Sequence, residues 1–485
     1  MHARLLLYCF LPGFHTVQKP PALPQDQHYT LQRLALQHPD LVDRFYRERQ
    51  GSLFWFGAER KPIEPGNDMP GNDTAGKDRP GKGTPGENIP GKDMPGKSAW
   101  GRDSLRRELS YRIGYAAWQG LDSNRYHPQE IRRREAVYEG DAPTGNTRDS
   151  PEEQNADRMY TDAAITLCKD LYQGGGIGSL ISYDGISPAY GEQEDRLLLD
   201  RLGRCANAEA LAALVTSLEP VDRQYRVLRD SLAAALKSGD TRKQRRLAAA
   251  MNIGRWIRHR NFDRFIIVNI ASTTLRYYSG DTLRLSMKIV AGQASKRTPR
   301  FAAWCGQVIL YPYWNVPRKI AIRELLPVFK RLPASVTAMN MQILDGRGQV
   351  IDPSRLAWAS YDKDHFPYSV RQSTGCDNAL GVIKFNLTSP YDVYLHDTNF
   401  KMAFLSGYRY YSHGCIRLEK PMDLASELLR HTLDTGFLKS CLKDQQPVTL
   451  DLENRVPVFV VYLTAEADDS GAGIAWFKDV YHLEN

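Results

Sequence analysis

Two histidines and a cysteine lie close together in the stretch YLHDTNFKMAFLSGYRYYSHGCIRLEKP, at positions 396, 413 and 415. A cysteine attacks as its thiolate, and a free thiol supplies only about a few per cent of that form near neutral pH. A neighbouring imidazole can take the thiol proton and later return one to a leaving group. His396, His413 and Cys415 therefore have the residue types for nucleophilic acyl transfer, and Gly414 would let backbone N–H groups face a developing oxyanion.

The same residues allow two other interpretations. A zinc site built on His396, His413 and Cys415 lacks an evident further ligand, although Asp397 is adjacent. Core histidines and a core cysteine would only need hydrogen bonds to satisfy them. The sequence SHGC, however, forms a glycine-containing turn after a stretch rich in tyrosine and arginine, which is an unfavourable place for core packing.

The composition of the chain is that of a globular protein with a modest basic excess. Its 485 residues include 64 Lys plus Arg against 56 Asp plus Glu, a net charge of +8. The basic residues are scattered among acidic ones without aromatic interleaving or a reader motif, so we expect no nucleic-acid partner. The glycines of QGGGIGS lack the lysine of a phosphate loop and the third glycine of a dinucleotide fingerprint, so we expect no nucleotide either.

Cysteine spacing and the N-terminus bear on the cellular compartment. The seven cysteines form no CxxC pair, which argues against a structural zinc site, and their odd number leaves at least one thiol unpaired. No run of eighteen apolar residues is present to span a membrane. Residues 1–26 are expected to be a leader or a disordered N-terminus, with a short apolar run interrupted by Pro12 and an uncertain start codon.

Helical periodicity dominates the region before residue 260. Residues 27–57 and 98–260 are predicted to form a helical scaffold domain, with a first helix over 29–56 and another beginning at Ser150 as its N-cap. Between the two parts, residues 58–97 carry a glycine at every fifth position, usually after proline. This segment has almost no large apolar side chains, so we expect a low-complexity Pro-Gly pentapeptide spacer.

From residue 261 onward the apolar pattern changes to that of strands. The stretch TLRYYSGDTLRLSMKIVAG alternates apolar and polar residues around Ser279-Gly280-Asp281, which predicts a hairpin. Residues 261–485 are therefore expected to form a mainly-β domain. A helix-rich insertion at about 318–370 is predicted to form a cap, so the fold class is α+β.

The residues around the cysteine resemble the signature of a known enzyme family. HDT followed by SHGCIRL is similar to the active-site motif of the YkuD-type L,D-transpeptidases, periplasmic enzymes that cross-link peptidoglycan stem peptides. Further blocks, including YPYWNVPRKIAIREL and RQSTGCDNALGVIKF, look like the large multidomain, YcbB-like branch of that family. The resemblance covers most of residues 40–480 and implies a YkuD-like catalytic domain with an inserted cap.

The resemblance implies a role for each matching residue. Cys415 would be the nucleophile, and His396 would be the general base and acid. Ser412 and His413 would shape the loop, and the backbone N–H groups around Gly414 would form the oxyanion hole. The residues implied on the substrate side are Arg417, whose planar fork suits a carboxylate, together with Tyr394, Trp314 and Asn378.

The implied function is that of a peptidoglycan L,D-transpeptidase in the periplasm or cell envelope. Cys415 would attack a donor tetrapeptide, and an amine of a second stem peptide would resolve the thioester into a 3–3 cross-link, without metal or organic cofactor. Water as acceptor would make an L,D-carboxypeptidase, and a lipoprotein lysine would make an anchoring transpeptidase. A non-catalytic wall-binding scaffold is an alternative of another class.

Several properties stay open at this level. The sequence does not decide the acceptor, the oligomeric state or the purpose of the spacer. Cys376 stands where the family pattern does not require cysteine, and we consider a bridge from it to Cys305 in an oxidising compartment. Carbapenems are expected to acylate Cys415, because the acyl-enzyme would be a thioester.

Overall fold

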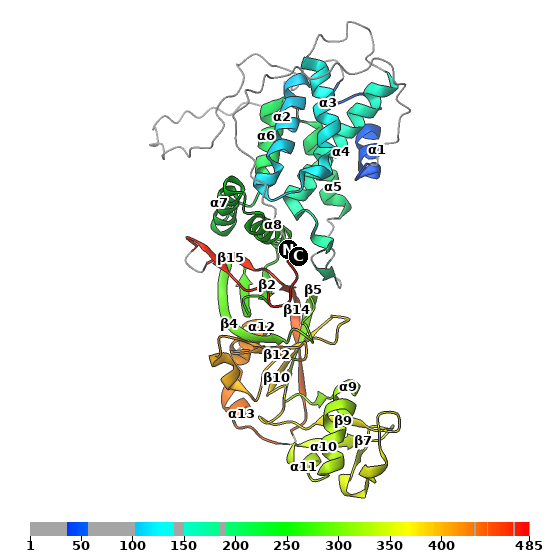
Figure 1. Ribbon diagram of the computed structural model, residues 1–485, viewed down its shortest axis with the longest axis vertical. Coiled ribbons are helices and arrows are strands. Elements are labelled where there is room, and N and C mark those ends of the chain that lie inside the picture. Colours follow the sequence, from blue (N-terminus) through cyan, green and yellow to red (C-terminus); the bar gives the residue numbers. More distant parts are fainter. Residues whose placement is uncertain are drawn as a thin grey trace, which may run out of the picture. The chain divides into compact units, whose positions relative to one another are not determined.

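The structure is a computed structural model (Figure 1). It describes residues 36–56, 102–139, 150–179, 181–183, 186, 191–430, 433–443, 445–468 and 471–484. The predicted leader at 1–26 and the predicted Pro-Gly spacer at 58–97 lie outside the described residues. No helix in the described part is both long enough and apolar enough to cross a membrane.

Helices dominate the described part of the chain before residue 260. They are α1 (Pro39–Glu48), α2 (Arg102–Tyr115), α3 (Pro128–Glu139), α4 (Pro151–Gln173), α5 (Glu192–Gly203), α6 (Ala208–Ser217), α7 (Arg223–Ser238) and α8 (Thr241–Arg258). As predicted, α4 begins after Ser150, whose hydroxyl accepts a hydrogen bond from the Glu153 N–H at 3.2 Å. This cap satisfies one of the backbone donors that a helix start leaves free.

The helix predicted over residues 29–56 is shorter in the structure, because α1 ends at Glu48. The aromatic residues that follow turn to the buried carboxylate of Asp157 on α4. The N–H groups of Phe54, Trp55 and Phe56 donate to that carboxylate at 2.8, 2.6 and 2.9 Å. Three hydrogen bonds to one buried charge therefore replace the helical bonds that continuation of α1 would supply.

The strands form a sheet whose path closes on itself. Its members are β1 (Ser182–Tyr183), β2 (Arg264–Asn269), β3 (Thr274–Ser279), β4 (Thr282–Gly292), β5 (Phe301–Leu310), β10 (Ile383–Leu387), β11 (Leu395–His396), β12 (Tyr410–Ser412), β13 (Ile416–Leu418) and β14 (Val448–Val461). The order is β1-β5-β10-β11-β13-β4-β3-β2-β14, and β14 also pairs with β5. The predicted hairpin is β3–β4, with Ser279 opposite Thr282.

The core inside this sheet is apolar and includes helix α12 (Pro421–Leu429) among the described elements. Helix α12 places Leu424, Ala425 and Leu428 among buried strand residues such as Ile289 and Val458. Burial of such side chains contributes roughly 1.5–3 kcal/mol each. The core therefore packs together strands from distant parts of the sequence.

A second, smaller sheet lies in the segment between β5 and β10. It contains β6 (Trp314–Asn315), β7 (Met341–Leu344), β8 (Val350–Ile351) and β9 (Ser369–Gln372) in the order β6-β9-β7-β8. The helices α9 (Arg318–Ile320), α10 (Leu326–Arg331) and α11 (Ser335–Ala338) accompany it. This segment, here called the cap, has its own core around Phe329, Ile343 and Phe366. The helices and mixed sheets confirm the α+β class.

Candidate active site

Adjacent strands bring the predicted histidine and cysteine to one face of the sheet. His396 on β11 lies opposite Lys384 of β10 and opposite Arg417 of β13. Tyr394 lies two residues before His396, and Cys415 lies two residues before Arg417. Because side chains alternate between the two faces of a sheet along each strand, Tyr394 and Cys415 point to the same face as His396 and Arg417. Contacts agree with this placement, because Tyr394 hydrogen-bonds Cys415 and its ring lies 5.8 Å from that of His396.

Cys415 carries a free thiol and lies immediately before β13. It is half-buried, and its Sγ lies 3.7 Å from the carbonyl oxygen of Asp392, to which it can donate. Burial raises the pKa of the Cys415 thiol, while hydrogen bonds from Tyr394 and the charges of Lys384 and Arg417 oppose that rise. The thiol is therefore protonated at neutral pH.

His396 is almost fully buried, with 4% of its surface exposed. Its Nδ1 hydrogen-bonds the carbonyl oxygen of Asp397, and a carbonyl only accepts, so Nδ1 carries the proton and Nε2 carries the lone pair. Burial, and then the nearby charge of Arg417, lower the pKa of His396 to about 3. Among the described residues, the neutral imidazole and the thiol are not hydrogen-bonded to each other.

Hydroxyl groups hold the loop before the cysteine. Gly414 has φ +124°, a conformation that favours glycine, and its N–H donates to the Ser412 hydroxyl at 3.1 Å. The same hydroxyl donates to the Cys415 carbonyl at 2.5 Å. Thr298 donates to the Gly414 carbonyl at 2.8 Å and accepts from the Gly292 N–H at 2.9 Å. The Ser412 hydroxyl thus bonds to two backbone groups of the loop, and Thr298 is a further support that the sequence did not reveal.

Two cations without a counter-charge flank the thiol. In the described part of the chain, neither Arg417 nor Lys384 has an ion-pair partner, and the buried Arg417 Nε has no hydrogen-bond partner. The Lys384 ammonium lies 4.2 Å from the centre of the Tyr394 ring, a favourable cation–π geometry. Sequence reasoning missed Lys384, although a lysine inside the otherwise apolar GVIKF strand was an available signal.

The remaining predicted residues occupy three different environments. His413 points to the cap, with its Nε2 3.0 Å from Glu324 Oε1, an oxygen that Lys296 also contacts at 3.0 Å. Trp314 at the start of the cap hydrogen-bonds the Tyr394 side chain beside the thiol.

Asn378 is completely buried, and its amide donates to the carbonyls of Pro312 and Ser373 at 3.2 and 2.7 Å. This position does not fit the predicted contact of Asn378 with substrate. The amide instead closes the turn in which it lies.

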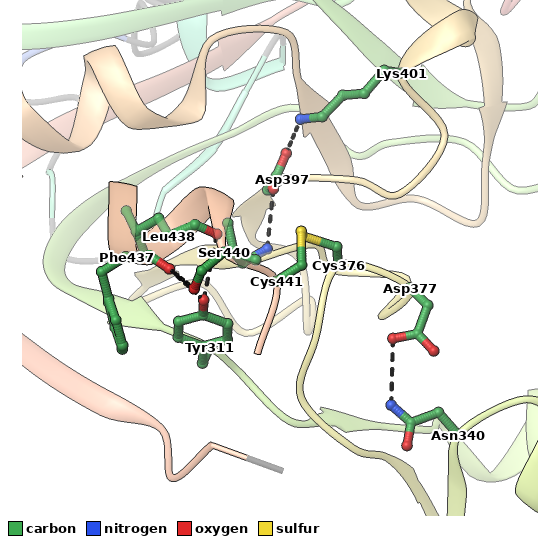
Figure 2. Close-up of a disulfide and its surroundings, with 11 residues drawn as sticks. Tyr311, Asn340, Cys376, Asp377, Asp397, Lys401, Phe437, Leu438, Ser440 and Cys441 are labelled. Carbon is green, nitrogen blue, oxygen red and sulfur yellow. Dashed lines mark hydrogen bonds and ion pairs between the residues drawn. A yellow bond between two sulfur atoms is a disulfide. The ribbon is translucent and has the colours of Figure 1, made fainter. Parts of the chain in front are cut away.

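The cysteine bridge considered from the sequence is wrong. Cys376 is bonded to Cys441, with a Cα–Cα distance of 5.0 Å (Figure 2). Cys305 lies in the buried part of β5 and is a free thiol. Cys441 follows Cys376 by 65 residues, so their proximity depends on the tertiary structure. Among the described residues, no cluster of three or more His, Cys, Asp or Glu side chains is suited to a metal ion.

Comparisons with known proteins find two matching family models. A family model for the L,D-transpeptidase catalytic domain (YkuD) matches residues 263–449, and a model named Scaffold domain matches residues 95–232. A Haemophilus influenzae protein named "Putative L,D-transpeptidase" is 37% identical over 233 residues. Residues 263–449 therefore match the family of L,D-transpeptidase catalytic domains that the motif resembles.

These similarities cover only part of each chain. The matched part is 48% of this chain and 47% of the Haemophilus protein, so the chain spans about half of that relative's length. An L,D-transpeptidase from Mycobacterium smegmatis is 14% identical with a TM-score of 0.18, covering 41% of this chain and 58% of that one. The catalytic domain from Enterococcus faecium is 15% identical with a TM-score of 0.18, covering 41% and 96%. Similarities this low carry no argument about the activity of this chain.

Proposed function

We propose that this protein is a peptidoglycan L,D-transpeptidase that forms 3–3 cross-links in the cell envelope through a thioester on Cys415. The observation that carries the proposal is the shared face of β10, β11 and β13. A free thiol, a neutral imidazole and two cations without counter-charges lie together there, within a domain of the L,D-transpeptidase family.

The imidazole of His396 moves the proton in both halves of the reaction. Its Nε2 takes the thiol proton as the Cys415 sulfur attacks the carbonyl carbon of the third residue of a donor tetrapeptide. Collapse of the tetrahedral intermediate breaks the peptide bond, and the same proton passes to the departing amine of D-alanine. The Nδ1–H bond to the Asp397 carbonyl keeps the ring in the required tautomer throughout.

Backbone donors beside the sulfur stabilise the oxyanion. The Gly414 N–H is already engaged by the Ser412 hydroxyl, so the Cys415 N–H is the donor that we assign to the oxyanion. The fixed conformation of the loop makes this donor available without reorganisation. Loss of one such donor typically slows acyl transfer by about 100- to 1,000-fold.

Arg417 and Lys384 suit an acidic substrate. A stem peptide carries carboxylates near the bond that is cleaved, and a carboxylate would pair the two cations that lack counter-charges. Trp314 and Tyr394 form the adjoining wall, where their rings would contact the peptide chain. In the second half-reaction, a side-chain amine from another stem attacks the thioester carbonyl and the C–S bond breaks. His396 takes the proton of the amine and passes it to the departing Cys415 sulfur, which restores the thiol.

The nucleophile is tested by mass spectrometry of the intact protein with a carbapenem. The Cys415 thiolate would open the four-membered ring at its carbonyl, so the adduct should carry the whole mass of the drug. Cys415→Ala should lose the adduct and Cys305→Ala should keep it, because Cys305 is buried in β5. An adduct of unchanged yield on Cys415→Ala contradicts the proposal.

The acceptor is tested with purified tetrapeptide-bearing muropeptides. Cross-linked dimers together with released D-alanine support transpeptidation. Shortened monomers alone would show that water is the acceptor, and transfer only to a lipoprotein lysine would show an anchoring activity. Binding to peptidoglycan without any thioester would favour the non-catalytic scaffold.

A further inference from the structure

The acceptor that orients His396 belongs to a residue whose own side chain is tightly held. Asp397 is 4% exposed, and its Oδ2 accepts a hydrogen bond from the Val382 N–H at 3.0 Å. The other carboxylate oxygen forms an ion pair with Lys401 (Figure 2). The Asp397 N–H donates to the Ile383 carbonyl at 2.8 Å. The Asp397 backbone carbonyl accepts the hydrogen bond from the His396 ring. Contacts of both the side chain and the main chain of Asp397 therefore hold this carbonyl in place.

One loop, residues 373–382, supplies most of this hold and is called the tether loop here. Gly381 has φ +58°, and a Cβ built on it would lie 2.3 Å from Asp397 Oδ2 and 2.6 Å from Asp397 Cβ. Only glycine therefore lets the loop approach Asp397 so closely. On the other side of Asp397, the Asn399 side-chain amide donates to the Asp377 carbonyl of the loop at 2.9 Å.

The tether loop is itself anchored at two points. Inside the loop, the buried Asn378 side chain accepts from the Leu380 N–H at 2.7 Å, besides donating to the carbonyls described above. Outside it, the Cys376–Cys441 bridge ties the loop to the residues after α13 (Thr435–Lys439), as Figure 2 shows. Tyr311 holds α13 in turn, since its hydroxyl donates to the Phe437 carbonyl at 2.7 Å.

We propose that the tether loop and its disulfide position the general base. In this arrangement Cys376, Cys441 and Gly381 act on the reaction only through Asp397, whose carbonyl sets the tautomer and direction of the His396 ring. They are positioning residues that touch neither the substrate nor the sulfur. The inference rests on the proposed function for the role of His396. It deepens that function by giving the Cys376–Cys441 disulfide, which lies outside the catalytic motif, a positioning role.

A positioning role of the tether loop would change how the acylation rate depends on pH, whereas a purely structural role would not. An oriented neutral imidazole assists attack over the whole pH range in which it stays unprotonated, so the acylation rate depends weakly on pH. Without that assistance, attack requires free thiolate, and the rate should rise about tenfold for each unit of pH below the thiol pKa. The slope of the rate against pH therefore reports whether the imidazole is in place.

Two kinds of variant distinguish an effect of the tether loop on His396 from a general loss of stability. Cys376→Ser/Cys441→Ser removes the bridge, and Cys205→Ser is its control because Cys205 is a free thiol elsewhere in the helical region. Gly381→Ala forces a Cβ against Asp397. Its control is Gly348→Ala, since Gly348 also has a positive φ, +79°, but has nothing within 4 Å of the added Cβ.

The measurement is the rate of carbapenem acylation at Cys415 between about pH 5 and pH 9, with thermal unfolding recorded for each variant. We expect the bridge and Gly381 variants to lose about 10- to 100-fold of the rate at neutral pH, as a misplaced catalytic group does, and to gain the steep pH slope. The two control variants should keep the wild-type profile. Folded bridge and Gly381 variants with wild-type rates and slopes would overturn the inference.

A second readout does not depend on acylation. Nuclear magnetic resonance of isotope-labelled histidine, assigned by loss of the signal in His396→Gln, reports the tautomer of His396 directly. A single Nδ1–H tautomer in the wild type and a mixture in the tether variants support the inference. If the wild type shows no adduct at Cys415, the proposed function fails, whereas an unchanged tautomer in folded tether variants defeats the positioning role itself.

Discussion

Around the single residues His396 and Cys415, burial and charge favour two neutral partners over a preformed ion pair. Arg417 illustrates the balance, because its charge lowers the pKa of the imidazole and also opposes the rise in the pKa of the thiol. In the proposed reaction, the proton would therefore stay on sulfur until a substrate binds. The neutral imidazole of His396 would then accept that proton, and a carboxylate of the substrate would offset the Arg417 charge.

The low pKa of His396 has a consequence for stability in acid. In the unfolded chain the imidazole has an ordinary pKa of 6.5, and in the folded protein its pKa is about 3. Between these values the unfolded state binds the proton and the folded state does not, so the free energy of unfolding decreases as the pH falls from about 6.5 to about 3. This contribution to stability is complete above pH 6.5.

Replacement of the residue tests this linkage. His396→Gln should show a shallower loss of stability over the same pH range, measured by urea denaturation at a series of pH values. His365→Gln is the control, since the His365 side chain is 79% exposed and lies on the cap. Equal slopes for the wild type and His396→Gln would contradict the assigned environment.

At the scale of elements, the Glu324 carboxylate of the cap contacts the loop before Cys415. Glu324 lies 3.0 Å from both the His413 ring and the Lys296 ammonium. The hydrogen bond from Lys296 is the main cause of the lowered pKa of Glu324, with further lowering from His413. His413, predicted as part of the active site, therefore links the motif to the cap.

The exposure of this cluster sets the size of the expected effect. Glu324→Gln should raise the KM for a tetrapeptide substrate by less than about fivefold and leave kcat nearly unchanged, because partly exposed ion pairs contribute about 0.2–1 kcal/mol. High salt should produce a similar shift in the wild type. Asp352→Asn, which alters an ion pair within the cap, is the control in steady-state kinetics. A large fall in kcat for Glu324→Gln would contradict a role limited to cap contact.

At the scale of the whole molecule, α8 joins the helices to the sheet. Trp256 is fully buried and packs edge-on against Phe459 of β14, with ring centres 5.0 Å apart. Beside it Arg255, also fully buried, donates to the Gln119 carbonyl at 2.6 Å and to the Asn252 side chain at 2.9 Å. Apolar packing and a buried hydrogen-bond network therefore meet on one helix.

Removal of the indole tests how strongly this junction supports the fold. Trp256→Ala should lower the free energy of unfolding by about 3–5 kcal/mol, the usual cost of truncating a buried aromatic side chain. Trp476→Ala should cost much less, because Trp476 is 39% exposed. Denaturant titrations followed by circular dichroism measure both, and similar losses for the two variants would contradict the proposed importance of the junction.

Much of the fold could be predicted because its signals are local. The change of apolar period near residue 261, the turn at Ser279-Gly280-Asp281 and the N-cap at Ser150 each depend on neighbours in the chain. The end of α1 could not be predicted in this way. Its limit depends on the Asp157 carboxylate, which arrives from α4 about a hundred residues later.

For the candidate site, the sequence by itself determined the chemistry: a thiol, an imidazole and a glycine-containing loop at a spacing typical of one enzyme family. Tertiary structure alone decided what surrounds them. Strand register set Lys384 opposite His396, and chain folding brought Cys441 to Cys376 and buried Asn378. The physical reason is that residue types and turns are encoded locally, whereas strand pairing and burial arise from contacts between distant segments that only the assembled core brings together.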